Sequence, residues 1–221
     1  MRLNLRRRWW REIFFLAALL FSLIALLPLR FALGWLGFAD KGLAAREATG
    51  SVWLGALAEA RFGQAPLGDV ATRLRVLPLL IGRARLDLAQ ADDGLSGGVT
   101  VSRHGFGIDD ASGRIDAPAL ADLPPPTLDL SDLSVRFGDG LCVHAEGLVK
   151  ARFAGELAGV PLAAGFSGEA RCDGPALLLP LASQSGGDRL EVRLFADGRY
   201  RIDGALRPGG VLYSPRFEGR F

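Results

Sequence analysis

Residue types that carry chemistry are scarce in this sequence of 221 residues. Only two of its 26 basic side chains are lysines, and it has two histidines and two cysteines. No glycine-rich loop is followed by Lys-Ser or Lys-Thr, and neither cysteine has a second ligand at CxxC-like spacing. The sequence therefore predicts neither a phosphate-binding loop nor a zinc site.

A strong charge of one sign is also missing. The formal net charge is +2, and five arginines fall within the first eleven residues. Setting aside these five and Glu12 leaves 21 basic and 23 acidic side chains, with no basic stripe. Because a nucleic-acid surface concentrates positive charge, we expect no nucleic-acid partner.

The few reactive side chains do not form a convincing catalytic set. Ser102, His104 and Asp109-Asp110 are close in sequence, but same-face neighbours on a strand stand about 7 Å apart, and proton transfer needs about 3 Å. We expect no catalytic residue, with His104 on the surface and His144 on a half-buried strand face. The pairs Asp92-Asp93 and Asp109-Asp110 adjoin glycines, which favours solvated turns over a calcium site. No metal, cofactor or small-molecule substrate is expected.

Apolar residues dominate the start of the chain. The run from Ile13 to Leu29 has no charge, follows the five arginines directly and resumes after Arg30. At about 1.5 Å per residue the first part covers roughly 25 Å of a ~30 Å hydrocarbon core. We predict a cytoplasmic basic tail over residues 1–12 and a transmembrane anchor over 13–38, with the remaining chain on the far side of the membrane. The alternative is a cleaved signal peptide with its site at Gly37-Phe38-Ala39.

The two cysteines, Cys142 and Cys172, both fall in the part predicted to be exported. In an oxidising compartment a pair about thirty residues apart predicts a disulfide. The alternative is two unrelated buried thiols.

From Lys41 onward, apolar residues recur with period two in short segments separated by glycine, proline and aspartate. Most of the 29 glycines are in this part, and no long helical stripe follows residue 45. The fold class is therefore mainly β. We expect a single N-terminal transmembrane helix followed by an antiparallel, glycine-rich β-sheet domain, either a sandwich or a curled open sheet.

The clearest hairpin runs from Arg189 to Leu206. A three-residue loop would pair Leu194 with Tyr200 and Val192 with Ile202 on one apolar face, with Gly198 in the left-handed position. The opposite face would then be charged, so we expect this hairpin to be buried on one side and wet on the other.

Four prolines fall between residues 117 and 127, a density that the middle of a sheet does not tolerate. We interpret this segment as a joint between two β lobes, over residues 45–116 and 128–221.

A motif follows the predicted anchor. Its residues are Gly50, Val52, Trp53, Gly55, Leu67, Gly68, Pro78, Leu79, Leu80, Gly82 and Arg83. We interpret Trp53 as a core residue that pins a first strand, Leu67 as the start of the return strand, and the Pro-Leu-Leu segment as a corner that covers one end of the sheet.

The order of these residues strongly resembles the type II secretion system protein N family, and the segment from Arg171 to Gly186 is similar to the C-terminal part of that family. The resemblance implies an accessory subunit of the bacterial inner membrane, single-pass and with most of its chain in the periplasm, in the machine that exports folded proteins. It implies no catalysis.

Two roles follow from these observations. In the first, the domain makes protein contacts with other type II secretion subunits through a sheet edge or face, while its N-terminal helix contacts membrane lipid. The alternative is an AsmA-like β protein whose apolar groove binds or conducts lipid. A closed sandwich would favour the first role, and an open apolar trough wider than an acyl chain would favour the second. Crosslinking from the strand between Tyr200 and Leu206 would test for a partner.

Overall fold

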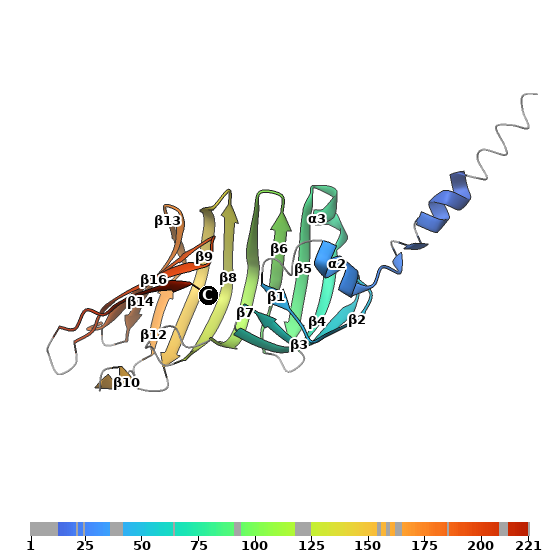
Figure 1. The fold of residues 1–221 in the computed structure, drawn as a ribbon. Coiled ribbons are helices and arrows are strands. Elements are labelled where there is room, and N and C mark those ends of the chain that lie inside the picture. Colours follow the sequence, from blue (N-terminus) through green and yellow to red (C-terminus); the bar gives the residue numbers. More distant parts are fainter. Residues whose placement is uncertain are drawn as a thin grey trace, which may run out of the picture.

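The computed structural model describes residues 13–20, 22–23, 25–35, 42–63, 65–90, 94–117, 125–153, 156–157, 160–161, 165–184, 186–207 and 212–220. Residues 13–20 are helical and project away from a large β-sheet (Figure 1). Within these ranges, no helix combines the length and the apolar character needed to cross a membrane.

Two short helices and seventeen strands are labelled within the described ranges. The helices are α2 (Leu29–Trp35) and α3 (Val76–Leu80). The strands of the first half are β1 (Leu43–Ala44), β2 (Glu47–Gly50), β3 (Gly55–Phe62), β4 (Ala65–Arg75), β5 (Arg83–Gln90), β6 (Ser96–Ser102) and β7 (Gly105–Asp116). Those of the second half are β8 (Pro126–Gly138), β9 (Leu141–Phe153), β10 (Glu156–Leu157), β11 (Val160–Pro161), β12 (Phe166–Glu169), β13 (Arg171–Asp173), β14 (Ala176–Ser183), β15 (Arg189–Phe195), β16 (Arg199–Ala205) and β17 (Arg216–Arg220).

All but two of these strands belong to one antiparallel sheet. Its order is β1-β3-β4-β5-β6-β7-β8-β9-β12-β14-β15-β16-β17, with β2 paired to β3 and β13 paired to β14. The strands β10 and β11 pair only with each other. The sheet is open and curled rather than a two-layer sandwich (Figure 1). The predicted mainly antiparallel β fold is therefore confirmed.

The apolar core lies on one face of this sheet, because inward side chains alternate with outward ones along each strand. On β5, Ala84, Leu86 and Leu88 are buried. Two clusters of buried side chains share this face. One is centred on residues such as Leu57 and Leu86, and the other on residues such as Val149, each of them 1% exposed.

The hairpin of β15 and β16 has the predicted register. Leu194 pairs with Tyr200 and Val192 with Ile202, and Gly198 has a φ of 83° in the three-residue loop. Tyr200 and Ile202 are buried, while Arg201 on the outer face is exposed. The alternation of apolar residues in the sequence thus correctly predicted the register of this hairpin and its buried face.

The strands on either side of the predicted joint are direct neighbours. Strand β8 begins at Pro126, and β7 and β8 pair from Asp116 with Thr127 as far as Gly105 with Gly138. The sheet therefore continues from one half to the other, whereas its core forms two clusters. Residues 118–124 of the joint lie outside the described residues. The lobe boundaries remain a prediction.

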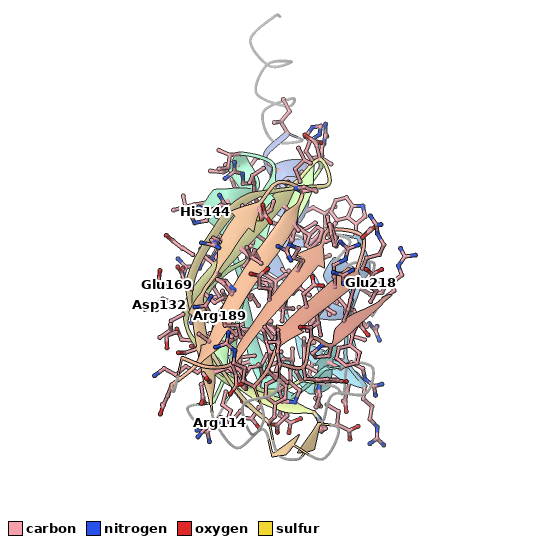
Figure 2. The ribbon with its side chains drawn as sticks, turned by 90° about the vertical axis from the view of Figure 1, so that its left-hand side faces the viewer. Arg114, Asp132, His144, Glu169, Arg189 and Glu218 are labelled. Carbon is pink, nitrogen blue, oxygen red and sulfur yellow. A yellow bond between two sulfur atoms is a disulfide. The ribbon has the colours of Figure 1, made fainter. Side chains whose placement is uncertain are left out.

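The two ends of the sheet have different connections. One end, here called the turn end, contains residues 51–54, 76–82, 103–104, 139–140, 174–175 and 196–198. The other, the loop end, contains the described residues 63, 94–95, 117, 125, 156–157, 160–161, 165, 184, 186–188, 206–207 and 212–215. Figure 2 shows His144 toward the turn end and Arg114 at the loop end.

Candidate interaction surfaces

The residues considered for catalysis do not come together. His104 lies in the turn between β6 and β7, and its Nδ1 is 3.5 Å from a carboxylate oxygen of Asp139. Both side chains are exposed, and Ser102 donates its hydroxyl hydrogen to the carbonyl oxygen of Gly105. Asp109 pairs with Arg136 instead of a histidine, at 3.0 Å.

His144 is exposed on β9, and its Nε2 lies 3.2 Å from Glu146. Within the described part of the chain, no three His, Cys, Asp or Glu side chains are grouped as metal ligands. Residues Asp92 and Asp93 lie outside the described residues.

The expectation that Asp109-Asp110 forms a solvated turn is wrong. Both residues lie within β7, at a register shift where Asp110 has a φ of 54°. Asp109 is buried, and it accepts hydrogen bonds from the Thr100 hydroxyl and from Arg136. These contacts join residues far apart in the sequence, so the neighbouring glycines gave no sign of them.

Arg85 connects three strands on the outer face of the sheet. Its Nε lies 3.0 Å from Asp87 on its own strand, and its Nη2 lies 2.9 Å from Asp110 on β7. Burial alone would lower the pKa of Arg85, but the hydrogen bonds to Asp110 and Asp87 outweigh it and raise that pKa. The side chain crosses β6 at Gly98, where an added Cβ would approach Nε to 2.9 Å. The arginine thus uses the space that the glycine leaves.

The structure joins Cys142 and Cys172 by a disulfide, with Cα atoms 5.5 Å apart. Strand β12 pairs with β9 as far as Glu169, and Ala170 then donates to the carbonyl oxygen of Gly147. Beyond this point β13 pairs with β14 and not with β9. The disulfide therefore links β13 to β9 past the end of the β12–β9 pairing.

The first part of the family motif forms the turn between β2 and β3. Gly50 has a φ of 82°, and an added Cβ on Gly55 would lie 2.8 Å from the carbonyl oxygen of Thr49. Val52 is the buried side chain of this turn, at 1% exposed. The placement of Trp53 on a first strand is wrong, because Trp53 lies in the turn and is only half-buried against the core cluster.

The second part of the motif lies around β4. This strand begins at Ala65, two residues before the predicted start at Leu67, which is buried. Gly68 has a φ of 69° and lies near a bulge at Glu59. The β3–β4 register shifts by one residue between Leu57 and Ala60 and shifts back between Ala60 and Arg61.

The third part of the motif, from Pro78 to Arg83, contains the end of α3 and the start of β5. Leu79 packs against the core, Gly82 has a φ of 73°, and Arg83 begins β5. The expectation of a corner that covers the sheet is wrong for Leu80, which is 78% exposed. This end of the sheet therefore presents apolar side chains outward.

The two edges of the sheet differ. At the first edge, Val52 donates to the carbonyl oxygen of Leu27, and Pro28 forms a bridge with Ser51, so the segment before α2 runs beside the turn of β2 and β3. At the second edge, β17 pairs with β16, and no described strand pairs with its other side. A strand edge of this kind has backbone donors and acceptors available to another chain.

Two cross-strand ion pairs hold β17 in place. Arg216 lies 2.7 Å from Asp203, and Glu218 lies 2.8 Å from Arg201. Strand β16 itself is flanked on both sides, and its Tyr200 and Ile202 are buried. Crosslinking positions therefore belong on β17 rather than on the strand between Tyr200 and Leu206.

A family model described as type II secretion system (T2SS), protein N, matches residues 41–213, from just before β1 to just before β17. The chain belongs to the T2SS protein N family. This match confirms the resemblance inferred from the motif, all of which lies within the matched residues. Neither the comparison with curated proteins nor the comparison with solved structures found a match.

Membership of this family associates the chain with type II secretion, as a structural or accessory component rather than a known enzyme. The apolar face of the sheet in this family member is buried along the core clusters, with Leu57, Leu86 and Leu190 each 1% exposed. These side chains are covered, but the described strands form an open sheet and not the closed sandwich expected for the protein-contact role.

Proposed function

We propose that this protein N family member is an accessory subunit of the type II secretion machinery, anchored in the inner membrane and making protein contacts in the periplasm. Three features support the proposal. The family model matches most of the chain, the uncharged run from Ile13 to Leu29 follows five arginines, and the pair Cys142–Cys172 suits an oxidising compartment.

The observation that carries the contact role is the edge at β17. An extended segment of another secretion subunit would add to the sheet there through main-chain hydrogen bonds. The outer side chains of β17 alternate as arginine, glutamate and arginine at Arg216, Glu218 and Arg220. They supply charges of both signs that would set the register of the added strand.

Site-specific photo-crosslinking in cells tests this role. A photoreactive residue at Glu218, at the margin of the sheet in Figure 2, is expected to capture another subunit of the machine, identified by mass spectrometry. The matched control is Lys150, which is exposed on β9 but lies between two paired strands. Capture of phospholipid alone, or the same products from both positions, would contradict the proposal and favour the lipid-binding alternative.

A second variant separates edge pairing from general proximity. An added Cβ on Gly219 would lie 2.5 Å from the hydroxyl oxygen of Tyr200, so Gly219→Val should displace β17 from β16. We expect capture from position 218 to fall while capture from position 150 stays as low as before. Unchanged capture from the displaced strand would show that the edge is not the contact.

A further inference from the structure

We infer that the turn end of the sheet rests on the membrane surface, with α3 as a second, shallow contact beside the N-terminal anchor. This inference rests on the anchored arrangement proposed above. Its basis is the distribution of exposed apolar side chains, the position at which the N-terminal segment joins the sheet, and arginines beside α3.

Exposed large apolar side chains gather at the turn end. After Trp35, those in the described part of the chain are Leu54, Val76, Leu77, Leu80, Ile81, Leu141, Val143, Leu212 and Tyr213. All but Leu212 and Tyr213 belong to the turn end or to the first residues of a strand that starts there. Exposed apolar surface costs free energy in water, so the gathering of these side chains at one end marks a contact with another apolar phase or molecule.

The α3 segment has the character of an interfacial helix. Leu79 packs against the core, whereas Leu77 and Leu80 are each 78% exposed and Ile81 is 71% exposed. These exposed side chains therefore point away from the core cluster against which Leu79 packs. A short apolar segment with outward-facing side chains of this kind can insert them shallowly into a membrane surface, toward the acyl chains.

The N-terminal segment reaches the sheet at the same end. Leu27 and Pro28 contact the turn of residues 51–54, and Leu33 of α2 packs against the core cluster against which Leu79 also packs. A membrane that holds the segment before α2 would therefore lie near α3. This proximity identifies the bilayer, rather than a protein, as the phase that covers the exposed side chains.

The charges beside α3 agree with a bilayer. Arg83 at the start of β5 and Arg103 in the next turn at this end are exposed, and no described acidic side chain forms an ion pair with either of them. Guanidinium groups bind phosphate oxygens well, and anionic lipid surfaces attract basic side chains near them. These two arginines would lie at headgroup level when Leu77 and Leu80 enter the acyl region.

Depth-dependent quenching with the full chain tests the inference. Leu80→Cys is labelled with an environment-sensitive fluorophore, without reduction of the native cysteine pair. The protein is reconstituted in vesicles of phosphatidylethanolamine and phosphatidylglycerol, with or without doxyl-labelled lipid. The matched control is Gln184→Cys, exposed at the loop end.

We expect a blue shift and loss of fluorescence with doxyl lipid at position 80, and neither at position 184. Equal signals at the two positions, whether quenched or not, would overturn the inference. Flotation of the same vesicles separates the two proposals. Protein that floats without quenching at position 80 overturns only the surface contact, whereas protein that does not float overturns the anchor and the contact with it.

Discussion

The two ends of the sheet are built from the same strands but differ in their connections and in what they expose. At the turn end most connections are two to four residues long, and apolar side chains such as Leu77 and Leu80 are exposed. At the loop end, a hollow of about 540 Å³ is lined mostly by polar residues and glycine, including Gln90, Arg114 and Asp129. The difference shows that a uniform sheet can present an apolar surface at one end and a polar one at the other.

The largest expected effect concerns the disulfide at the turn end. Its cysteines are 30 residues apart, so the loop-closure model predicts that replacing both Cys142 and Cys172 by alanine lowers the free energy of unfolding by ~3–4 kcal/mol. Urea unfolding without reductant measures this loss. A reductant should destabilise the wild type to a similar extent and leave the double variant unchanged. Two free thiols in the unreduced, denatured wild type would contradict the prediction.

A smaller effect separates the buried and exposed side chains of α3. Leu79→Ala should cost about 1–2 kcal/mol of unfolding free energy, because Leu79 packs against the core. The matched variant Leu80→Ala should change it by less than about 0.5 kcal/mol, because that side chain is exposed. Urea unfolding of the detergent-solubilised chain compares the two. Equal losses would show that Leu80 serves the fold rather than a surface contact.

The smallest effect concerns acid sensitivity at the loop end. A hydrogen bond from Arg114 at 2.9 Å, together with the positive charge of Arg152, lowers the pKa of Asp129. The ionised carboxylate therefore stabilises the fold above the unfolded pKa of about 3.9, and this stabilisation is lost as the pH falls through the lower folded value. Asp129→Asn should cost less than about 1 kcal/mol at pH 7.

The control for this prediction lies at the turn end. Asp139→Asn also replaces an aspartate, but one whose side chain is highly exposed, and it should change stability very little. Urea unfolding at pH 7 and pH 3 should show the difference between wild type and Asp129→Asn shrinking at the lower pH. A difference that grows on acidification would contradict the assignment.

Local patterns predicted some parts of this fold well. The alternation of Leu190, Val192 and Leu194 before Asp197-Gly198 was sufficient to predict the register of the last hairpin. The period of two also identified the buried residues of β5. These features depend on neighbours in sequence, which is why one sequence could reveal them.

Other features depend on contacts that no local pattern contains. Strand β17, which forms the outer edge, has only five residues. The alternation of charged residues with phenylalanine and glycine in it was too short to predict a strand. Asp109 is held by Arg136, 27 residues away, so its neighbouring glycines suggested a turn instead. At the first turn, the size of the Trp53 indole suggested a core residue on a strand, but Trp53 lies in the turn and packs half-buried against the core, beside the fully buried Val52.

The candidate surfaces show the same division. The sequence predicted a sheet edge or face as the contact, but it pointed to the strand between Tyr200 and Leu206, which is flanked on both sides. It also identified the segment from Pro78 to Leu80 without indicating that Leu80 faces outward. Hydrophobicity alone does not distinguish an apolar residue that packs inside from one that meets a membrane.

From β3 onward, strand order follows chain order except where β12 pairs with β9 past the separate pair of β10 and β11, and where β13 pairs with β14 beside the main path. A chain exported from its anchored end onward would therefore find the partner for each new strand already delivered. The sheet would then fold during export. At each stage only the last exported strand would have an unpaired edge that could bind a wrong partner.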